Sequence, residues 1–324
     1  MIKSCVIGLS RIGIIHCQSL VKLKKTQLSF VYDCDDKLSN KFANKFNCKT
    51  SSKFEDILNQ KDIELFVIAS PTITHARYIK KLINKNKMIY CEKPIFLNAQ
   101  IIKQFSQKIK NKKIKFGVGL NRRFAIPYIK LKKLVHNKKI NVINITSKSF
   151  NTNIKKSISN GGLFMDKGFH FFDLACWLLS SKPYEVECEA RSISNKIYLK
   201  NNDFSKAIIK MKFNKNICVK FYFSRVNKLG HEENITIIGD DFSINTDNFF
   251  RKDILYEDYD IKFQDTYYEC LKNFVTNNKS YLLEEGITAQ LICDAVLKSA
   301  NLEKKKQCFA SVFGSSLVVR ETFN

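Results

Sequence analysis

The stretch IKSCVIGLSRIG, residues 2–13, decides the fold class of this chain. Its apolar half, Ile2–Ile7, is typical of a buried β-strand, and residues 12–24 have the periodicity of an amphipathic helix. Gly8 and Gly13 stand between strand and helix, where a tight turn must bring the backbone close to a bound phosphate. A strand, a glycine turn and a helix in this order predict the first βα unit of a dinucleotide-binding domain.

The turn departs from the pattern G-x-G-x-x-G at one position. Ser10 stands where the second glycine is expected, so its side chain crowds the pyrophosphate while its hydroxyl offers a hydrogen bond. Asp33 ends the next strand, 20 residues after Gly13, where a carboxylate meets the adenosine ribose hydroxyls. Cys34 follows instead of an arginine, which favours NAD over NADP, although the flexible Lys37 could reach a phosphate. The alternative role for Asp33 is a helix N-cap.

Strands alternate with helices throughout the first 120 residues, which predicts a doubly wound parallel sheet of Rossmann type. The further expected strands are Leu28–Tyr32, Glu64–Ala69, Lys87–Cys91 and Ile114–Val118, and the further helices are 36–46, 74–85 and 98–110.

Two of these strands end in polar segments, at the edge where open α/β sheets bind ligands. The segments are Ser70-Pro71-Thr72-Ile73-Thr74-His75 and Cys91-Glu92-Lys93-Pro94. The alternative for the second is a solvated Lys and a turn Pro. The expected cofactor-binding residues are Gly8, Ser10, Arg11, Ile12, Gly13, Asp33, Ser70, Pro71, His75, Glu92, Lys93 and Pro94.

The pattern changes after Asn121, where period-two alternation predicts an α+β domain with a large open, mostly antiparallel sheet. The expected strands are 140–149, 184–193, 204–213, 216–225 and 233–239, and the helices are 124–136, 161–179, 263–276 and 286–304. We therefore expect an NAD-binding domain at 1–121 and a substrate-binding and oligomerisation domain at 122–324. Helix 286–304 is expected to pack back on the first domain.

Residues 161–177, GGLFMDKGFHFFDLACW, are the most informative stretch of the second half. Asp166, His170 and Asp173 are spaced i, i+4 and i+7, so they form one polar stripe on an otherwise apolar, buried helix. A histidine suits proton transfer near neutral pH, and a nearby carboxylate can orient it. The alternative is a structural His/Asp pair with no catalytic role.

In this order and spacing, G-x-x-R-I-G, E-K-P and GG-x-x-x-D-x-G-x-H-x-x-D resemble the glucose–fructose oxidoreductase / inositol dehydrogenase (Gfo/Idh/MocA) family. The resemblance runs from Ile2 to about Glu303, and Gly119-Leu120-Asn121-Arg122-Arg123-Phe124 is most similar to the inositol 2-dehydrogenase branch. It implies a Rossmann domain, an open sheet whose exposed face forms a homodimer or homotetramer, and hydride transfer between a secondary alcohol of a cyclitol or sugar and NAD.

The resemblance also implies residue roles. Lys93 would hydrogen-bond the reacting hydroxyl, His170 would be the general base, and Asp166 would position substrate and tune the base. The implied substrate contacts are Lys93, Arg122, Asn151, Asp166, His170, Asp173 and the weaker candidate Tyr267. Two departures, Ser149 in place of a histidine and His231 in place of a tyrosine, leave inositol itself open as the substrate.

The sequence leaves other functions open. One is a sugar-nucleotide or amino-sugar oxidoreductase of the same family, whose acidic substrate would suit a basic cleft. Another is a nucleotide-binding regulator without catalysis, although Lys93, Asp166 and His170 together argue against it. The net charge of +25 invites a nucleic-acid partner, but only 8 of the 55 basic residues are Arg, the residue that reads guanine edges. The lysines are typical of coding bias and of solvated helix faces.

The composition indicates in which cellular compartment the protein works. The 11 Cys are scattered, odd in number and without a C-x-x-C pair, so we expect neither a disulfide framework nor a metal site. We find no uncharged run long enough for a membrane span and no signal-peptide pattern at the N-terminus. The expected location is the cytoplasm, with a small polyol or sugar as partner and no specific nucleic acid.

Overall fold

The computed structural model describes residues 1–150, 154–192, 196–201, 203–246, 259–277, 281–302, 308–311 and 319–321. The chain forms two compact units, the first of Met1–Asn121 and Phe263–Ile287 and the second of Arg122–Lys262 and Thr288–Asn324. The first change of unit falls at the predicted domain boundary. Within the described ranges, no helix is long and apolar enough to cross a membrane.

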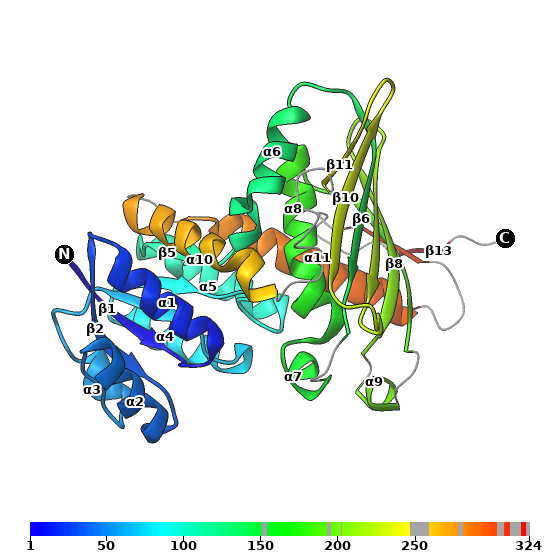
Figure 1. The fold of residues 1–324 in the computed structure, drawn as a ribbon. Helices are drawn as coiled ribbons and strands as arrows, with labels where there is room; N and C mark the ends of the chain where they lie inside the picture. Colours follow the sequence, from blue (N-terminus) through cyan, green and yellow to red (C-terminus); the bar gives the residue numbers. More distant parts are fainter. Residues whose placement is uncertain are drawn as a thin grey trace. The chain divides into compact units, whose positions relative to one another are not determined.

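Unit 1 is built on a five-stranded parallel sheet in the order β2-β1-β3-β4-β5 (Figure 1). Its strands are β1 (Ile2–Ile7), β2 (Thr26–Tyr32), β3 (Leu65–Ile68), β4 (Met88–Cys91) and β5 (Phe116–Val118). Its helices are α1 (Arg11–Lys22), α2 (Asp36–Phe46), α3 (Phe54–Leu58), α4 (His75–Asn84) and α5 (Ala99–Asn111). The strands are apolar and largely buried because helices connect them, and the predicted Rossmann class is confirmed.

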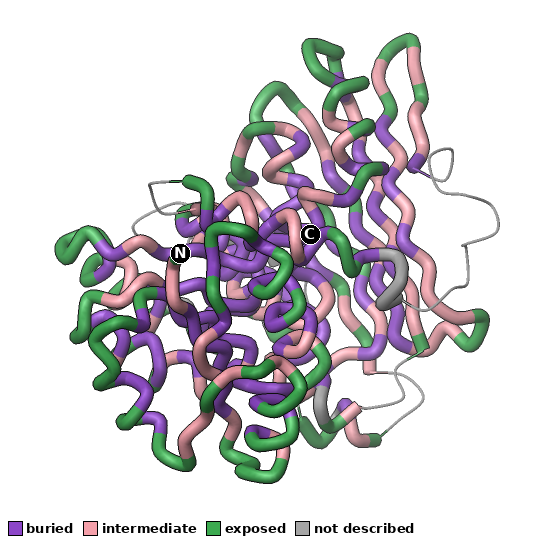
Figure 2. The backbone as a smooth tube through the Cα atoms, turned by 60° about the vertical axis from the view of Figure 1, so that its left-hand side comes forward, coloured by how far each residue is buried: buried purple, intermediate pink, exposed green. Residues whose placement is uncertain are grey.

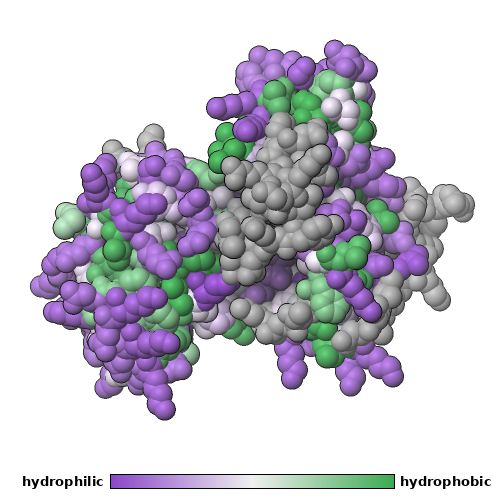
Figure 3. Space-filling view, in the orientation of Figure 1, coloured by the Kyte–Doolittle hydropathy of each residue, from purple (hydrophilic) through white to green (hydrophobic). Residues whose placement is uncertain are grey.

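The lysine runs of unit 1 lie on its surface, as their helical spacing predicts. Lys22, Lys24 and Lys25 are exposed at the end of α1, while Leu23 among them is buried. Hydrophilic residues cover most of the face of this unit that Figure 3 shows.

The closing helices divide between the units differently from the sequence-based expectation. Helix α10 (Tyr259–Thr276) belongs to unit 1 from Phe263 onward, whereas α11 (Leu283–Leu302) belongs to unit 2 from Thr288 onward. Gly286 and Ile287 belong to unit 1 and the residues from Thr288 onward to unit 2, so the packing of 286–304 on the first domain stays a prediction. From the second half of the sequence, the helix that lies mainly in unit 1 is α10. Its apolar face explains this, because the Phe274 ring lies 5.5 Å from the Tyr90 ring of β4.

Unit 2 contains an eight-stranded sheet in the order β11-β10-β6-β9-β8-β7-β12-β13. All of its strand pairs are antiparallel except β6 with β9, so the predicted open, mostly antiparallel sheet is confirmed. The strands are β6 (Ile140–Lys148), β7 (Glu185–Arg191), β8 (Lys206–Phe213), β9 (Ile217–Ser224), β10 (Glu232–Gly239), β11 (Ser243–Asn245), β12 (Cys308–Ser311) and β13 (Val319–Glu321).

One face of this sheet is covered by helices and the other is not fully buried. Buried and less buried residues alternate along the strands, as purple and pink in Figure 2. The buried face meets α8 (Phe169–Leu179), whose Phe172 ring lies 5.2 Å from Phe221 of β9, and α11, whose Ser299 hydroxyl accepts the Cys188 N–H. The remaining helices of this unit are α6 (Ile126–Leu134), α7 (Ile154–Ser159) and α9 (Lys196–Lys200).

The predicted continuous helix over 161–179 is interrupted. A π-helical turn, η3 (Phe164–Gly168), precedes α8, so the helix is wider where Asp166 lies than where His170 lies. The expected stripe of Asp166, His170 and Asp173 therefore crosses a change of helix type, with Asp166 on the π turn and the other two residues on α8. Such turns occur frequently at functional sites.

Candidate active site

The glycine turn after β1 has no room for side chains. Gly8 has a φ of +90°, and a Cβ there would lie 2.5 Å from the Ser70 backbone after β3. A Cβ on Gly13 would lie 1.8 Å from the Gly8 carbonyl oxygen. The backbone of the turn therefore packs directly against the segment after β3, and the first N–H groups of α1 lie beside it.

The start of α1 suits an anion. Ser10 is the N-cap of the helix, and its hydroxyl makes no capping hydrogen bond. The first turn holds no acidic residue, Arg11 is exposed and Ile12 is half-buried. Neither a side-chain cap nor a carboxylate competes for the N–H groups, so the positive end of the helix dipole can face a phosphate.

Asp33 is fixed to the glycine turn. Its Oδ2 accepts the Leu9 N–H at 2.7 Å, and its Oδ1 accepts the Asp35 N–H at 3.1 Å. The N-cap of α2 is Asp35, whose carboxylate accepts the N–H groups of Lys37 and Leu38. The alternative of Asp33 as the helix cap is therefore excluded, and its carboxylate is held beside the turn.

The buried His75 connects the segments that follow β3 and β4. Its buried ring faces the carbonyl oxygens of Ser70, Pro94 and Ile95 at 2.8, 3.1 and 3.2 Å, and burial lowers its pKa. Pro71 is exposed beside it. The ring ties the segment after β3 to the Lys-Pro step, so His75 positions this edge rather than presenting its ring at the surface.

A buried carboxylate and imidazole hold the segment that follows β4. Glu92 Oε1 accepts from His16 Nε2 at 2.8 Å, and Glu92 Oε2 accepts the Lys93 N–H at 3.2 Å. His16 lies in α1 and is completely buried, with the Tyr90 and Tyr267 rings edge-on to it. The pair therefore connects the helix of the glycine turn to the half-buried Lys93, which precedes a cis Pro94.

In unit 2, Asp166 and His170 lie on either side of the change from π to α helix. Asp166 Oδ2 accepts the Ser157 hydroxyl at 2.8 Å and lies 3.9 Å from Arg225 Nη2, with 35% of its side chain exposed. His170, in the first turn of α8, is 5% exposed. Asp173, one turn later, accepts both Nε and Nη2 of Arg123, at 2.8 and 2.6 Å.

Unit 2 also contains buried ion pairs. Arg122 is 1% exposed and donates to Glu233 Oε1 at 2.9 Å. Tyr128 donates to Glu233 Oε2 at 3.0 Å, and His231 Nε2 lies 2.9 Å from Oε1. Glu233 thus joins three segments of unit 2.

A second buried pair lies beside Asp166. Arg225 is 2% exposed and donates from Nη1 to Asp203 Oδ2 at 2.6 Å. Asp203 Oδ1 accepts the N–H groups of Leu163 and Phe204, each at 2.8 Å. The carboxylate therefore fixes the chain just before η3.

Lys167, the residue after Asp166 on η3, places its ammonium group near these ion pairs. Its Nζ donates to Ser147 Oγ of β6 at 3.2 Å. Burial lowers the pKa of this ammonium to about 8, Glu233 and Asp166 act to raise it, and Arg225 and Arg122 act to lower it.

Two family models match the sequence, one in each unit's main segment. "Oxidoreductase family, NAD-binding Rossmann fold" matches residues 2–120, and "GFO/IDH/MocA C-terminal domain" matches residues 130–245. The chain belongs to the GFO/IDH/MocA oxidoreductase family. Its members are oxidoreductases, so the resemblance carried by the three motifs is confirmed.

Individual relatives agree with this membership. The chain is 26% identical over 323 residues to the myo-inositol 2-dehydrogenase of Thermotoga maritima, covering 93% of this chain and 96% of the relative. It is 28% identical over 253 residues to the scyllo-inositol 2-dehydrogenase (NAD(+)) of Bacillus subtilis, covering 75% and 73%. A probable dehydrogenase from Thermotoga maritima has the same fold, with a TM-score of 0.88, 24% identity and coverage of 96% and 99%.

The remaining expected residues of this GFO/IDH/MocA chain have different settings. Asn151 lies outside the described residues. Ser149 donates its N–H to the Ser224 carbonyl and is half-buried, and His231 is bound to Glu233. Tyr267, expected as a weaker substrate contact, lies in unit 1 with its ring against His16.

Sequence reasoning missed His16, Lys167, Asp203, Arg225 and Glu233. His16 falls three residues after Gly13, and Lys167 stands inside the D-x-x-x-H motif, so both were visible as polar residues in apolar segments. The other three gave no signal, because a charged residue near a strand end is ordinarily a solvated one. Glu233 lies on β10, Arg225 directly follows β9 and Asp203 precedes β8, so only the assembled sheet buries them.

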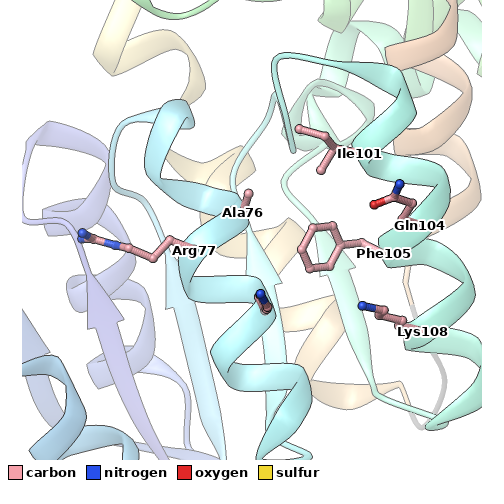
Figure 4. Close-up of a pocket in the computed structure, with 7 residues that line it drawn as sticks. Ala76, Arg77, Ile101, Gln104, Phe105 and Lys108 are labelled. Atoms are coloured by element: carbon pink, nitrogen blue, oxygen red, sulfur yellow. The ribbon is translucent and has the colours of Figure 1, made fainter.

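A separate pocket of 370 Å³ lies between α4 and α5, on the helices of unit 1 (Figure 4). Phe105 points from α5 toward α4 across an apolar floor that includes Ala76 and Ile101. Arg77, Lys80 and Lys108 supply its cations. It is formed by helix side chains instead of strand ends, so it is distinct from the glycine turn.

Proposed function

We propose that this oxidoreductase is an NAD-dependent dehydrogenase that oxidises a secondary alcohol of a cyclitol or sugar. One observation carries the proposal: both halves of the catalytic set stand inside the family-matched segments. Lys93 follows β4 within the NAD-binding part, and Asp166 and His170 flank the π-to-α change within the C-terminal domain. The names of the inositol-dehydrogenating relatives support a polyol substrate.

The cradle in unit 1 fits a dinucleotide. Gly8 and Gly13 leave room that a Cβ would fill, and Ser10, Arg11 and Ile12 begin α1 beside it. NAD is preferred over NADP in this proposal, because the Asp33 carboxylate can accept ribose hydroxyls but repels a 2′-phosphate. Lys37 does not offset this, since the Asp33 carboxylate is held directly at the turn.

The chain's own groups would handle the proton of the reacting hydroxyl. When bound, NAD supplies the hydride acceptor. Lys93 donates a hydrogen bond to the hydroxyl oxygen and stabilises the negative charge that develops there. Neutral His170 takes the hydroxyl proton, and Asp166 holds the substrate and favours the imidazolium that forms.

Supporting roles follow from the ion pairs. Asp173 and Arg122 are committed to Arg123 and Glu233, so they hold the walls of the substrate region instead of turning toward solvent. Asn151 is proposed as a further substrate contact on the resemblance alone. Tyr267 acts on the His16–Glu92 pair rather than on the substrate.

We propose a homodimer or homotetramer formed through the less buried face of the large sheet. Cross-strand pairs on this face, Glu185 with Lys212 and Glu187 with Lys210, place both charges on one surface, which suits self-complementary contact. The described cysteines from Cys5 to Cys293 are free thiols, which supports a reducing, cytoplasmic location.

Nicotinamide absorbance would test the proposal directly. Purified protein is mixed with NAD or NADP and a panel of polyols led by myo-inositol and scyllo-inositol. We expect reduction with NAD and at least one polyol, and a much slower rate with NADP. Binding of NAD without reduction of any panel member, including sugar acids and sugar phosphates, would contradict a dehydrogenase and favour a regulator.

A further inference from the structure

A buried imidazole of unit 1 stands beside the Lys93 segment and takes no part in the proposed proton transfer. His16 on α1 is completely buried, and its Nε2 lies 2.8 Å from Glu92 Oε1. Its Nδ1 is also buried and meets no hydrogen-bond partner in the described part of the chain. A proton on Nδ1 would be buried without an acceptor, so we assign the ring proton to Nε2, from which His16 donates to the Glu92 carboxylate.

The Glu92 carboxylate is enclosed by several segments of unit 1. Its Oε2 accepts the Lys93 N–H at 3.2 Å, and the Glu92 backbone N–H donates to the Ile68 carbonyl of β3 at 2.9 Å. A Cβ on Gly119, directly after β5, would lie 2.7 Å from Glu92 Oε1. The carboxylate therefore fills the space that a side chain at residue 119 would need, and N–H donors from α1 and from the chain after β4 hold its charge.

The backbone of Lys93 is held on both sides. Its N–H donates to Glu92, and the carbonyl oxygens of Pro94 and Ile95, which follow it, lie 3.1 and 3.2 Å from Nδ1 of the buried His75. Lys93 itself is half-buried. The short segment that presents its side chain is therefore attached to the interior at both ends.

The His16 attachment has no obvious substitute. The Tyr90 and Tyr267 rings pack edge-on against His16, with ring centroids 5.4 and 5.9 Å from its own, and the imidazole has no exposed surface. Loss of its N–H would leave Glu92 Oε1 buried without that donor, which is costly for a carboxylate. The carboxylate would have to turn, and its hydrogen bond to the Lys93 N–H would be lost with it.

We propose that His16 is a positioning residue, which acts through Glu92 to fix the Lys93 backbone so that the Lys93 ammonium reaches the reacting hydroxyl. This rests on the proposed dehydrogenase function and deepens it. A lysine side chain is long and flexible, so the place of its ammonium depends on where its backbone is held. A misplacement of about 1 Å at a reacting group costs about 100-fold in rate, which makes an indirect contact of this kind matter. Since His16 follows Gly13 by three residues, the helix that begins at the glycine turn also holds the catalytic lysine.

Steady-state kinetics test this chain of contacts. His16→Phe keeps an aromatic ring but removes the donor, so kcat should fall by about 10–100-fold while the Kd for NADH and the KM for substrate change by less than about 3-fold. His16→Gln keeps an N–H donor and should recover most of the loss. Because His16 acts through Lys93, His16→Phe should cause no further loss in a Lys93→Met background. A full further loss in that background, or a His16→Phe effect seen only in KM or in NADH affinity, overturns the inference.

Ser19→Ala is the matched control. Ser19 lies on the same helix, is 4% exposed and donates to the Ile15 carbonyl, so its loss removes a buried hydrogen bond of α1 that does not involve Glu92. Its kcat should stay within about 3-fold of the wild type. Equal losses of kcat in Ser19→Ala and His16→Phe would assign the effect to loosening of α1 and would overturn the inference. If His16→Phe does not fold, Glu92→Gln replaces it, because an amide in place of one acceptor oxygen breaks the same chain of contacts from the other side.

Chemical labelling of Lys93 separates this inference from the proposed function. Wild type, His16→Phe and His16→Gln are treated with trace acetic anhydride without substrate, and mass spectrometry measures the acetylation of Lys93 relative to Lys115. A released segment opens more readily, so Lys93 labelling should rise by at least about 3-fold in His16→Phe and stay near the wild-type value in His16→Gln. If no substrate is oxidised but labelling changes in this way, the positioning role stands and the dehydrogenase fails. Unchanged Lys93 labelling in His16→Phe overturns the inference whatever the activity.

Discussion

The glycine turn of unit 1 and the charge cluster of unit 2 are held in place by different parts of the chain. The charge cluster consists of Arg122, Asp166, Asp203, Arg225 and Glu233. The turn is made of backbone: Gly8 and Gly13 form it, and its Leu9 N–H donates to Asp33, 24 residues later in the chain. The cluster is made of side chains from distant segments, such as Arg122 and Glu233, which are 111 residues apart. A backbone site is specified by local sterics, whereas a side-chain site depends on strand register.

The difference predicts how each region fails. A change in the turn should act on cofactor affinity, because nothing else can replace the backbone there. A substitution in the cluster should lower the stability of the protein or its affinity for substrate. The reason is that removing one charged side chain leaves its oppositely charged partner buried and unpaired. The following four variants test this contrast, beginning with the largest expected effect.

Lys93→Met should lower kcat by about 10²–10⁴-fold while leaving NAD affinity nearly unchanged, since only the hydrogen bond to the reacting hydroxyl is lost. Steady-state kinetics and a fluorescence titration with NADH measure the two quantities. Lys115→Met, which removes a lysine donating to the Val275 carbonyl, is the control. Near-wild-type turnover in Lys93→Met would remove Lys93 from the mechanism.

Gly13→Ala should weaken NAD binding by at least about 100-fold, since the new Cβ would lie 1.8 Å from the Gly8 carbonyl oxygen. The turn must open to admit it, which moves the N–H groups of α1. Gln18→Ala, on the exposed face of the same helix, should change the Kd for NAD little. Unchanged NAD affinity in Gly13→Ala would mean that the cofactor does not use this turn.

Arg225→Met should destabilise the protein by about 3–5 kcal/mol, because the Asp203 carboxylate would stay buried without its cation. Urea unfolding monitored by circular dichroism measures this. Arg191→Met breaks a pair in which both side chains are more than half exposed, so it should cost at most about 1 kcal/mol. Equal losses from the two variants would show that the Arg225–Asp203 pair is not held in the interior.

Lys167→Met should raise the free energy of unfolding at pH 7, by up to about 3 kcal/mol, since the charge of a partly buried ammonium is removed. Burial lowers the folded-state pKa of Lys167 to about 8 from an ordinary 10.5, so the unfolded chain binds more protons between these values. Wild-type stability should therefore rise with pH across this window, and the variant should lack that rise. Urea midpoints at pH 7 and pH 10 measure it, and parallel slopes in the two proteins would contradict it.

The structure bears out the local patterns of the sequence. The strand at Ile2–Ile7 agrees at both ends, because an apolar run followed by Gly8 leaves few alternatives. The turn between β1 and α1 is likewise visible from spacing. The helix over 161–179 was anticipated in extent but not in geometry, since nothing in its apolar periodicity signals the π turn at Phe164–Gly168.

The placement of α10 shows where pattern alone is insufficient. Its sequence position after the large sheet assigned it to the second domain, whereas Cys270 and Phe274 pack into unit 1. Contact with Val118 and Gly117 of β5 decides this, and those residues are about 150 positions earlier in the chain. An amphipathic pattern predicts that a helix packs against another layer, but it does not predict which layer.

The sequence by itself determined the alternation of strands and helices, the glycine turn with Asp33, and the D-x-x-x-H motif. These depend on sterics and periodicity over a few residues. Only the tertiary structure decided that Asp35, and not Asp33, caps α2, that Glu92 binds His16, and that Lys167 donates to the Ser147 hydroxyl. The physical reason is that the role of a charged side chain in the interior depends on its hydrogen-bond partners. Only sheet register and helix packing bring those partners within hydrogen-bond distance.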